Sequence, residues 1–206
     1  MKPHHSGLCA CALVACLPFA LASESANKPP IESVRIHPVF PDAFACQNHW
    51  EGQLKYTGDA LGTDCFVTEL VEDEKGRAFS RSFRRDGLRN EDWFSWEQPV
   101  LAPFSGKILK VNVNPKTNQP GELGAPPASF IVFQRADGVH VLLAHVKDIS
   151  VAEGDAVDIG QQVARVGNNG YGRNPHIHIG AWNSDGAPLQ IQMDLRAQGK
   201  LFETGE

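Results

Sequence analysis

The sequence predicts a mainly β domain built from short antiparallel strands, and three features carry this prediction. Short apolar segments recur from residue 99 onward, and Gly, Asn, Asp and Pro separate them at close intervals. Ala136, Asp137 and Gly138 stand between two such segments, as in a hairpin turn where glycine takes a positive φ. Beyond the N-terminal segment, no long stretch has the apolar period of an amphipathic helix. We therefore expect an antiparallel β-sheet core that resembles a barrel or sandwich.

The N-terminal segment has the features of a secretory signal. Lys2 precedes an apolar run over residues 8–22, which ends in small residues and is shorter than a membrane-spanning helix. We predict a signal peptide over residues 1–22, cleaved after Ala22, and hence a periplasmic or secreted protein with no transmembrane span in the mature chain. The alternative is a lipoprotein, because residues 13–16 resemble a lipobox ending in Cys16, although the residues that follow stay apolar.

Composition and charge bound the class of protein. The chain is 42% apolar and 21% charged, as in an ordinary globular domain. Its formal charge is −5, and removal of Lys2 with the signal changes this to 18 − 24 = −6. An acidic chain has no basic excess with which to neutralise phosphates, so we expect no nucleic-acid partner. The mature chain keeps Cys46 and Cys65, which either pair in an oxidising compartment or stay as two buried thiols.

The rest of the chain divides into three parts. Residues 23–32 form a polar linker that contains a double proline. Residues 33–98 supply N-terminal strands and an insertion, in which 62–71 is a strand leading to a charged turn and 79–96 is a hairpin or long loop. Residues 99–206 form the core and a C-terminal tail, with strands near 100–103, 106–111, 130–133 and 139–144 and a loop at 112–128 rich in Asn, Pro and Gly.

The stretch around residues 175–179 carries the clearest chemical signal. His176 and His178 are two residues apart, so on a strand both imidazoles point to one face while the isoleucines beside them point to the other. Neutral imidazole is a strong zinc ligand, and the alternative is a pair of exposed strand histidines. His145 ends an apolar strand and Asp64 begins one, but each of these alone is a weak signal.

Together, the order of these residues resembles the lysostaphin-type (LytM-like) zinc metallopeptidases. That family has an aspartate, an Ala-His at a strand end, a V-x-x-G-D-x-V-x-x-G-Q-x-V stretch, a G-N-x-G turn and then P-H-x-H. This chain has Asp64, then Ala144 and His145, and it matches the longer stretch over 151–163, the turn over 167–170 and the last motif over 175–178. The resemblance is close over 99–182 and loose around Asp64.

The resemblance implies the family's β-rich duplicated hybrid motif fold and an exported zinc endopeptidase that hydrolyses peptide cross-links of peptidoglycan. Asp64 and His178 would ligate Zn²⁺, while His145 and His176 would face the attacking water and the scissile carbonyl. Zinc lowers the pKa of a bound water toward ~7, and a nearby imidazole can accept the proton. The cleaved bond stays open between Gly–Gly and D-Ala–diaminopimelate.

The chain departs from the family at the first metal motif, where a histidine normally stands four residues before the aspartate. Here that position is Ala60, which cannot ligate a metal. We expect His49 to replace it, because an imidazole preserves the type of ligand. Asp59 is a second candidate, and a site with two protein ligands and water is a third.

One further function remains as an alternative, and a second, that of a carrier domain, is disfavoured because no lysine lies at the required hairpin tip. A degenerate metal site is also found in non-catalytic members of the family, which bind the wall or regulate wall hydrolases. The G-D-x-V-x-x-G-Q pattern also occurs in biotinyl and lipoyl carrier domains. Those domains need a modified lysine at a hairpin tip, usually flanked by methionine, and the only methionines here are Met1 and Met193.

Overall fold

The computed structural model describes residues 28–203. Residues 31–203 belong to one compact unit, which contains the fold discussed below. The expected signal peptide, its cleavage after Ala22 and the alternative lipid site at Cys16 lie outside the described residues. Within the described residues, no helix has the length and apolar character to cross a membrane.

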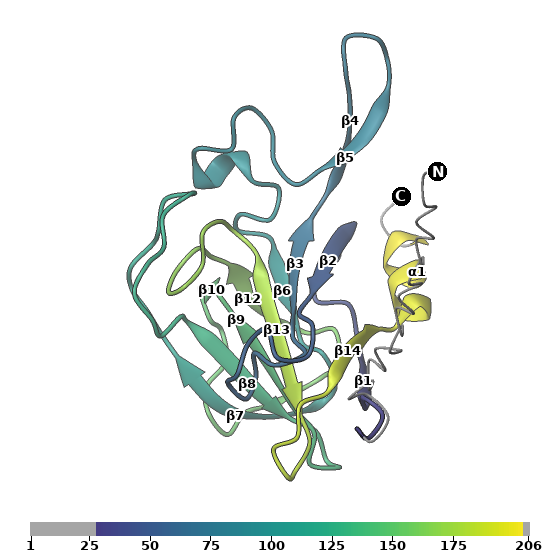
Figure 1. The fold of residues 1–206 in the computed structure, drawn as a ribbon, viewed down its shortest axis with the longest axis vertical. Helices are drawn as coiled ribbons and strands as arrows, with labels where there is room; N and C mark the ends of the chain where they lie inside the picture. Colours follow the sequence, from purple (N-terminus) through teal and green to yellow (C-terminus); the bar gives the residue numbers. More distant parts are fainter. Residues whose placement is uncertain (1–27, 204–206) are drawn as a thin grey trace, which may run out of the picture. The chain divides into compact units, whose positions relative to one another are not determined.

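A seven-stranded antiparallel sheet forms the main part of this unit (Figure 1). This sheet confirms the mainly β, antiparallel fold class. Its order across the sheet is β11-β7-β8-β9-β13-β3-β2. The strands are β2 (Phe44–Asn48), β3 (Thr63–Val67), β7 (Gly106–Asn112), β8 (Phe130–Gln134), β9 (His140–Ala144), β11 (Ala156–Val157) and β13 (Ile177–Trp182).

A smaller antiparallel sheet shares the core with the first. It has the order β10-β12-β6, with β10 at Val146–Lys147, β12 at Gln162–Val166 and β6 at Pro99–Leu101. Apolar side chains from both sheets belong to one buried cluster, which contains Phe133, Leu143 and Ile179 from the large sheet and Val146 and Val163 from the small one. Alternation along each strand directs these side chains inward, which is why short apolar segments suffice to build the core.

Strand β13 is buried on both faces, unlike a strand with one solvated face. Ile177, Ile179 and Ala181 are fully buried in the core, and His178 on the other face is only 6% exposed. The loop before β3 covers that face at Gly180, where an added Cβ would lie 1.4 Å from the carbonyl oxygen of Gly58. A glycine at position 180 is therefore required for the loop to approach β13 this closely.

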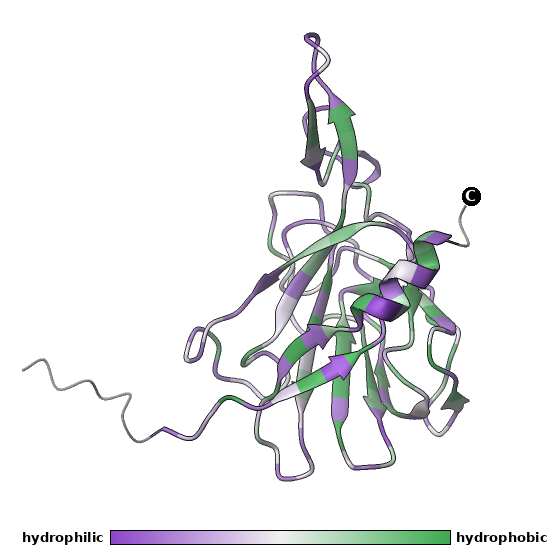
Figure 2. Cartoon of the chain, turned by 90° about the vertical axis from the view of Figure 1, so that its right-hand side faces the viewer, coloured by the Kyte–Doolittle hydropathy of each residue, from purple (hydrophilic) through white to green (hydrophobic). Residues whose placement is uncertain are grey.

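Four smaller features complete the unit. Strands β4 (Glu69–Glu72) and β5 (Ala78–Arg81) form a separate hairpin within the predicted insertion, followed by a 3-10 helix at Asn90–Asp92. Figure 2 shows apolar residues on this hairpin, where Leu70 is 78% exposed. Strands β1 (Ser33–Ile36) and β14 (Gln190–Met193) pair in parallel, and helix α1 (Leu195–Glu203) follows β14. The parallel pair and the helix were not expected from the sequence.

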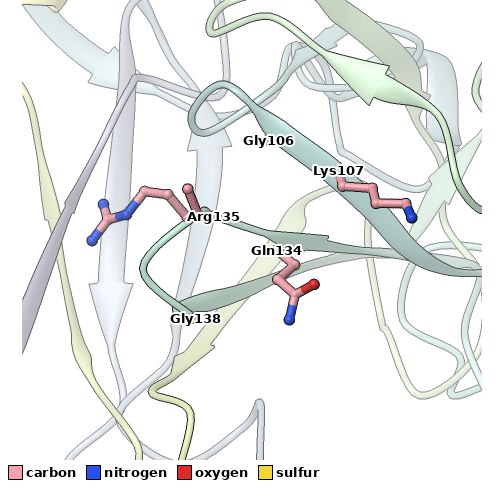
Figure 3. A pocket seen from close by; sticks show the side chains of 6 residues that line it. Gly106, Lys107, Gln134, Arg135 and Gly138 are labelled. Carbon is pink, nitrogen blue, oxygen red and sulfur yellow. The ribbon is translucent and has the colours of Figure 1, made fainter.

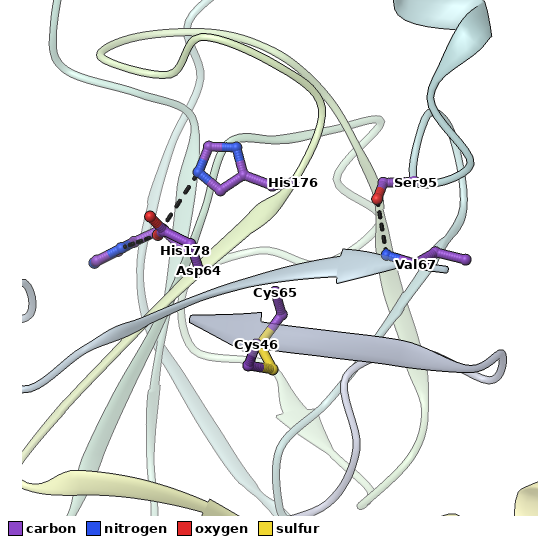
Figure 4. The surroundings of a disulfide bond; sticks show 7 residues. All are labelled: Cys46, Asp64, Cys65, Val67, Ser95, His176 and His178. Carbon is purple, nitrogen blue, oxygen red and sulfur yellow. Dashed lines mark hydrogen bonds and ion pairs between the residues drawn. A yellow bond between two sulfur atoms is a disulfide. The ribbon is translucent and has the colours of Figure 1, made fainter. Parts of the chain in front are cut away.

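A disulfide joins Cys46 on β2 to Cys65 on β3, which are directly opposite one another across the two strands (Figure 4). The expected pairing is thus present. Strand β2 is the edge of the seven-stranded sheet and has β3 as its only neighbour there. The disulfide therefore fixes the chain just before His49 to the strand that carries Asp64.

Candidate metal centre

Asp64 and His178 face each other across two neighbouring strands. They are register partners on the antiparallel strands β3 and β13, which brings their side chains together on one face of the sheet. The Nδ1 atom of His178 lies 2.9 Å from Oδ1 of Asp64 (Figure 4). Asp64, around which the resemblance in sequence is loose, thus lies in direct contact with His178, the second histidine of the P-H-x-H motif.

His49 reaches the same place from the end of β2. Its backbone N–H donates to the carbonyl oxygen of Gly62 at 2.8 Å, so the β2–β3 pairing continues one step past the strand. The ring lies 5.3 Å from that of His178, and its Nε2 is 3.3 Å from Oδ2 of Asp64. One ligand atom from each of His49, Asp64 and His178 lies within 4.8 Å of the other two.

The glycine at position 62 makes room for this arrangement. An added Cβ there would lie 2.7 Å from the carbonyl oxygen of Ile179 and 3.1 Å from Cε1 of His178. A larger residue would therefore displace the ring of His178 or the backbone of β13. Ala60, the position where the family has its histidine, contributes no donor atom.

Hydrogen bonds on the outer side of the two rings set which nitrogens carry a proton. Nδ1 of His49 donates to the carbonyl oxygen of Asp59 at 3.3 Å, and Nε2 of His178 donates to that of Gly58 at 3.1 Å. A carbonyl oxygen only accepts, so these nitrogens hold the protons. As long as both rings are neutral, the lone pairs of His49 Nε2 and His178 Nδ1 are directed at the carboxylate of Asp64.

Two lone pairs and a carboxylate cannot hydrogen-bond one another, so this position favours a positive charge. The pKa values agree with this conclusion. Burial lowers the pKa of His178, but its contacts with Asp59 and Asp64 outweigh burial and raise it to about 9. Burial raises the pKa of the Asp64 carboxyl, but the hydrogen bond from His178 and the nearby imidazoles hold it well below its usual range. Either a proton or a metal cation would satisfy these groups.

His145 and His176 lie beside this cluster with their protons fixed in a similar way. The ring of His145 is 4.5 Å from that of His176 and 6.3 Å from that of His178. Nδ1 of His145 donates to the carbonyl oxygen of Asn169 at 2.8 Å, and Nδ1 of His176 donates to that of Asn174 at 2.7 Å. Each ring therefore keeps an unprotonated Nε2.

Burial keeps both of these imidazoles neutral near pH 7. It lowers the pKa of His145 to about 3, helped by the neighbouring imidazoles of His176 and His178, and it lowers the pKa of His176 as well. His145 also has a φ of +66°, a left-handed backbone conformation that a residue other than glycine rarely adopts. Such strain at a side chain of this kind is typical of functional positions.

A group of buried asparagines holds the loop that orients His145. The side chain of Asn169 accepts from the backbone N–H of Ser129 at 2.7 Å and donates to the carbonyl oxygen of Val146 at 2.8 Å. Asn168 donates to Asn90 in the insertion at 2.9 Å. In the sequence, Asn168 and Asn169 indicate only a turn, because their contacts are with residues far away along the chain.

The insertion also contacts the site through aromatic rings. Phe66, two residues after Asp64 and on the same face of β3, stacks on His176 with ring centroids 5.3 Å apart. Trp93 lies 6.2 Å from Phe66, and Phe83 lies 5.0 Å from Trp93. Phe66 and Asp64 are two residues apart on one strand, so their spacing in the sequence already predicts that both side chains lie on the same face.

A surface pocket elsewhere contains none of the histidine or carboxylate groups of this site. It is lined by Gly106, Lys107, Gln134, Arg135, Ala136 and Gly138, beside the turn between β8 and β9 (Figure 3). None of the five site residues lines it, and its glycines and polar side chains form no cluster of metal donors. The candidate functional site is therefore the histidine cluster.

Part of the chain is similar to a known protein family. Residues 93–190 match the sequence model of peptidase family M23, a range that includes His145, His176 and His178 but begins after His49 and Asp64. No curated protein sequence matches the chain.

Several solved structures are similar in fold. The catalytic domain of the antimicrobial peptidase lysostaphin from Staphylococcus simulans is 19% identical with a TM-score of 0.43, covering 69% of this chain and 81% of that one. A single-residue mutant of the catalytic domain of the prophage-encoded M23 protein EnpA from Enterococcus faecalis is 18% identical with a TM-score of 0.47, covering 74% and 92%. A zinc-containing peptidase from Vibrio cholerae is 17% identical with a TM-score of 0.37, covering 62% and 48%. The finding that bears on the family is the match of residues 93–190, just under half of the chain, to the sequence model of peptidase family M23.

Proposed function

We propose that this chain is an exported zinc endopeptidase that hydrolyses peptide cross-links of peptidoglycan. The observation that carries the proposal is the convergence of His49, Asp64 and His178 next to two neutral imidazoles, those of His145 and His176. The match of residues 93–190 to peptidase family M23 supports the type of reaction. The Cys46–Cys65 disulfide supports export, since structural disulfides persist mainly in oxidising compartments.

The donor set of this centre fits zinc. Two imidazole nitrogens and a carboxylate match the three protein ligands of many catalytic zinc sites, whereas Ca²⁺ and Mg²⁺ prefer oxygen ligands. His49 Nε2, Asp64 and His178 Nδ1 would hold the ion. Bound zinc would supply a Lewis acid that polarises the scissile carbonyl and lowers the pKa of the attacking water.

His145 and His176 would provide the acid–base chemistry. Each has an unprotonated Nε2, and one of them would accept the proton of the attacking water and return it to the leaving amine. The other would lie against the scissile carbonyl. Their neutral state suits this role, because an imidazole that is already protonated cannot act as a base.

Zinc content and wall hydrolysis of single variants test the proposal. Alanine in place of His49, Asp64 or His178 should abolish both zinc retention and hydrolysis, because two protein ligands hold zinc too weakly. Alanine in place of His145 or His176 should abolish hydrolysis while zinc stays bound. The matched control is His140→Gln on β9, since His140 stacks on Trp182 outside the cluster. Full hydrolysis by the His49→Ala variant would refute the assigned ligand set.

The absence of a histidine at position 60 favours one other function. A peptidase-like domain that binds the wall or regulates wall hydrolases would need no metal. Alanine at position 60 would then mean that the ancestral metal site no longer supports catalysis. The same measurements separate the two functions. A wild-type protein that folds normally, binds no zinc and cleaves no peptidoglycan would replace the enzymatic function with the regulatory one.

A further inference from the structure

The loop from Tyr56 to Gly62 runs along the outer side of both candidate histidine ligands. Its two central carbonyl groups accept from the ring nitrogens that point away from Asp64, that of Asp59 from His49 and that of Gly58 from His178. The carboxylate of Asp59 adds a third contact, with Oδ1 lying 3.2 Å from Nε2 of His178. One short loop thus contacts both imidazoles on the side opposite the cluster.

The fold holds this loop firmly in place. Two internal turns close it, with the N–H of Asp59 donating to Tyr56 and the N–H of Gly62 donating to Asp59. Leu61 adopts a left-handed φ of +57°, and Gly58 lies directly over Gly180 on β13. The backbone at Asp59 is therefore held beside His178, and a carboxylate carried at this place can in turn orient the ring that it contacts.

We propose that Asp59 is a positioning residue for the metal centre, completing a carboxylate–histidine–metal arrangement through His178. This proposal rests on the proposed zinc site. A carboxylate that accepts the outer N–H of a ligating imidazole fixes the ring and makes its other nitrogen a stronger donor, and loss of such a partner typically weakens metal binding by about 10–100-fold.

The geometry separates this role from that of a ligand. Asp59 contacts Nε2 of His178, whereas Asp64 contacts Nδ1 of the same ring, so the two carboxylates lie on opposite sides of the imidazole. The group of atoms that could share one cation contains Asp64 but not Asp59. Asp59, a possible third ligand by the sequence, would therefore contact the ligand His178 and not the metal itself.

Zinc affinity, measured by competition with a chromophoric chelator on the full mature chain, tests the role. Asp59→Ala should bind zinc about 10–100-fold more weakly than wild type. Asp59→Asn should fall between them, because its amide oxygen can still share the N–H that His178 donates to Gly58, without the negative charge. Asp185→Asn, in the exposed turn that follows β13, is the matched control and should bind zinc like wild type.

Thermal unfolding of the metal-free proteins and X-ray absorption of the zinc-loaded ones complete the test. The isosteric Asp59→Asn variant should unfold within a few degrees of wild type, which separates weaker binding from a damaged fold. Equal zinc affinity in wild type and both Asp59 variants would overturn the positioning role while leaving the zinc site intact. Loss of an oxygen ligand in Asp59→Ala would overturn it by making Asp59 a ligand. A wild-type protein without zinc affinity would overturn the metal centre itself.

Discussion

The disulfide closes the part of the chain that contains most of the proposed metal centre. Cys46 and Cys65 are separated by 19 residues, and the loop between them includes His49, Asp64 and the carbonyl groups that orient both histidines. Breaking this link by Cys46→Ser should therefore affect both stability and metal binding. Cys46 lies at an exposed position of the edge strand β2, so the change removes the cross-link without placing a hydroxyl in the core.

The magnitude follows from the size of the loop. In the chain-entropy description, closing a loop of this length restricts the unfolded chain by about 3 kcal/mol at 25 °C. The free energy of unfolding of the metal-free protein should fall by about that amount, which corresponds to a decrease in Tm of roughly 6–12 °C for a domain of this size. Zinc affinity should also fall, because an edge strand held only by β3 then positions His49.

Urea denaturation of metal-free protein and chelator competition for zinc measure the two effects. Ala45→Ser is the matched control, since it introduces the same residue at an exposed position of the same strand. Reducing the wild-type protein should reproduce the loss seen in Cys46→Ser. A change in unfolding free energy below about 1 kcal/mol, well under the loop-closure estimate, would show that β2 and its disulfide contribute little to this part of the fold.

Three other predictions address the loops around the site. Asn169→Ala should leave two buried backbone groups unpaired, at a cost of about 1–3 kcal/mol each, and should reduce wall hydrolysis more than zinc content, because Asn169 holds the loop that orients His145. Gly180→Ala should displace the loop at Gly58 and weaken zinc binding by roughly tenfold or more, which chelator competition would detect. The imidazole of His145 should remain neutral at pH 5 in the metal-free protein, because its pKa lies at about 3, and an NMR titration with a midpoint near the ordinary value would contradict this burial argument.

The β architecture followed from local signals, whereas the elements that were missed depend on distant contacts. The strands around residues 100–111 and 130–144 were visible because apolar runs and turn residues alternate there. The pairing of β1 with β14 joins residues near the two ends of the fold, and no local pattern predicts it. Helix α1 has only nine residues, so it is not a long amphipathic stretch, and its start is marked by Asp194, whose carboxylate accepts from the backbone of Arg196 and Ala197.

The candidate site divides in the same way between local and long-range information. The parity of His176 and His178 follows from a single strand, so the sequence alone placed them on one face. The roles of Asn169 and Asp59 depend on loops that fold back over other strands, and both residues are of types that occur in ordinary turns. A sequence motif can thus indicate donor atoms, while the groups that orient those donors become visible only in the fold.

The position of His49 depends on both local and long-range information, because the strand spacing and the disulfide together predict where its side chain lies. If Cys46 and Cys65 pair directly across antiparallel strands, each step along one strand moves one step back along the other, which places residue 47 opposite Asp64 and His49 opposite Gly62. Side chains two residues apart share a face, so His49 must lie on the face of Asp64. Opposite His49, Gly62 leaves room for the ring of His178. A donor lost at position 60 can therefore be replaced from the neighbouring strand, provided that the register between β2 and β3 is fixed, and the disulfide fixes that register.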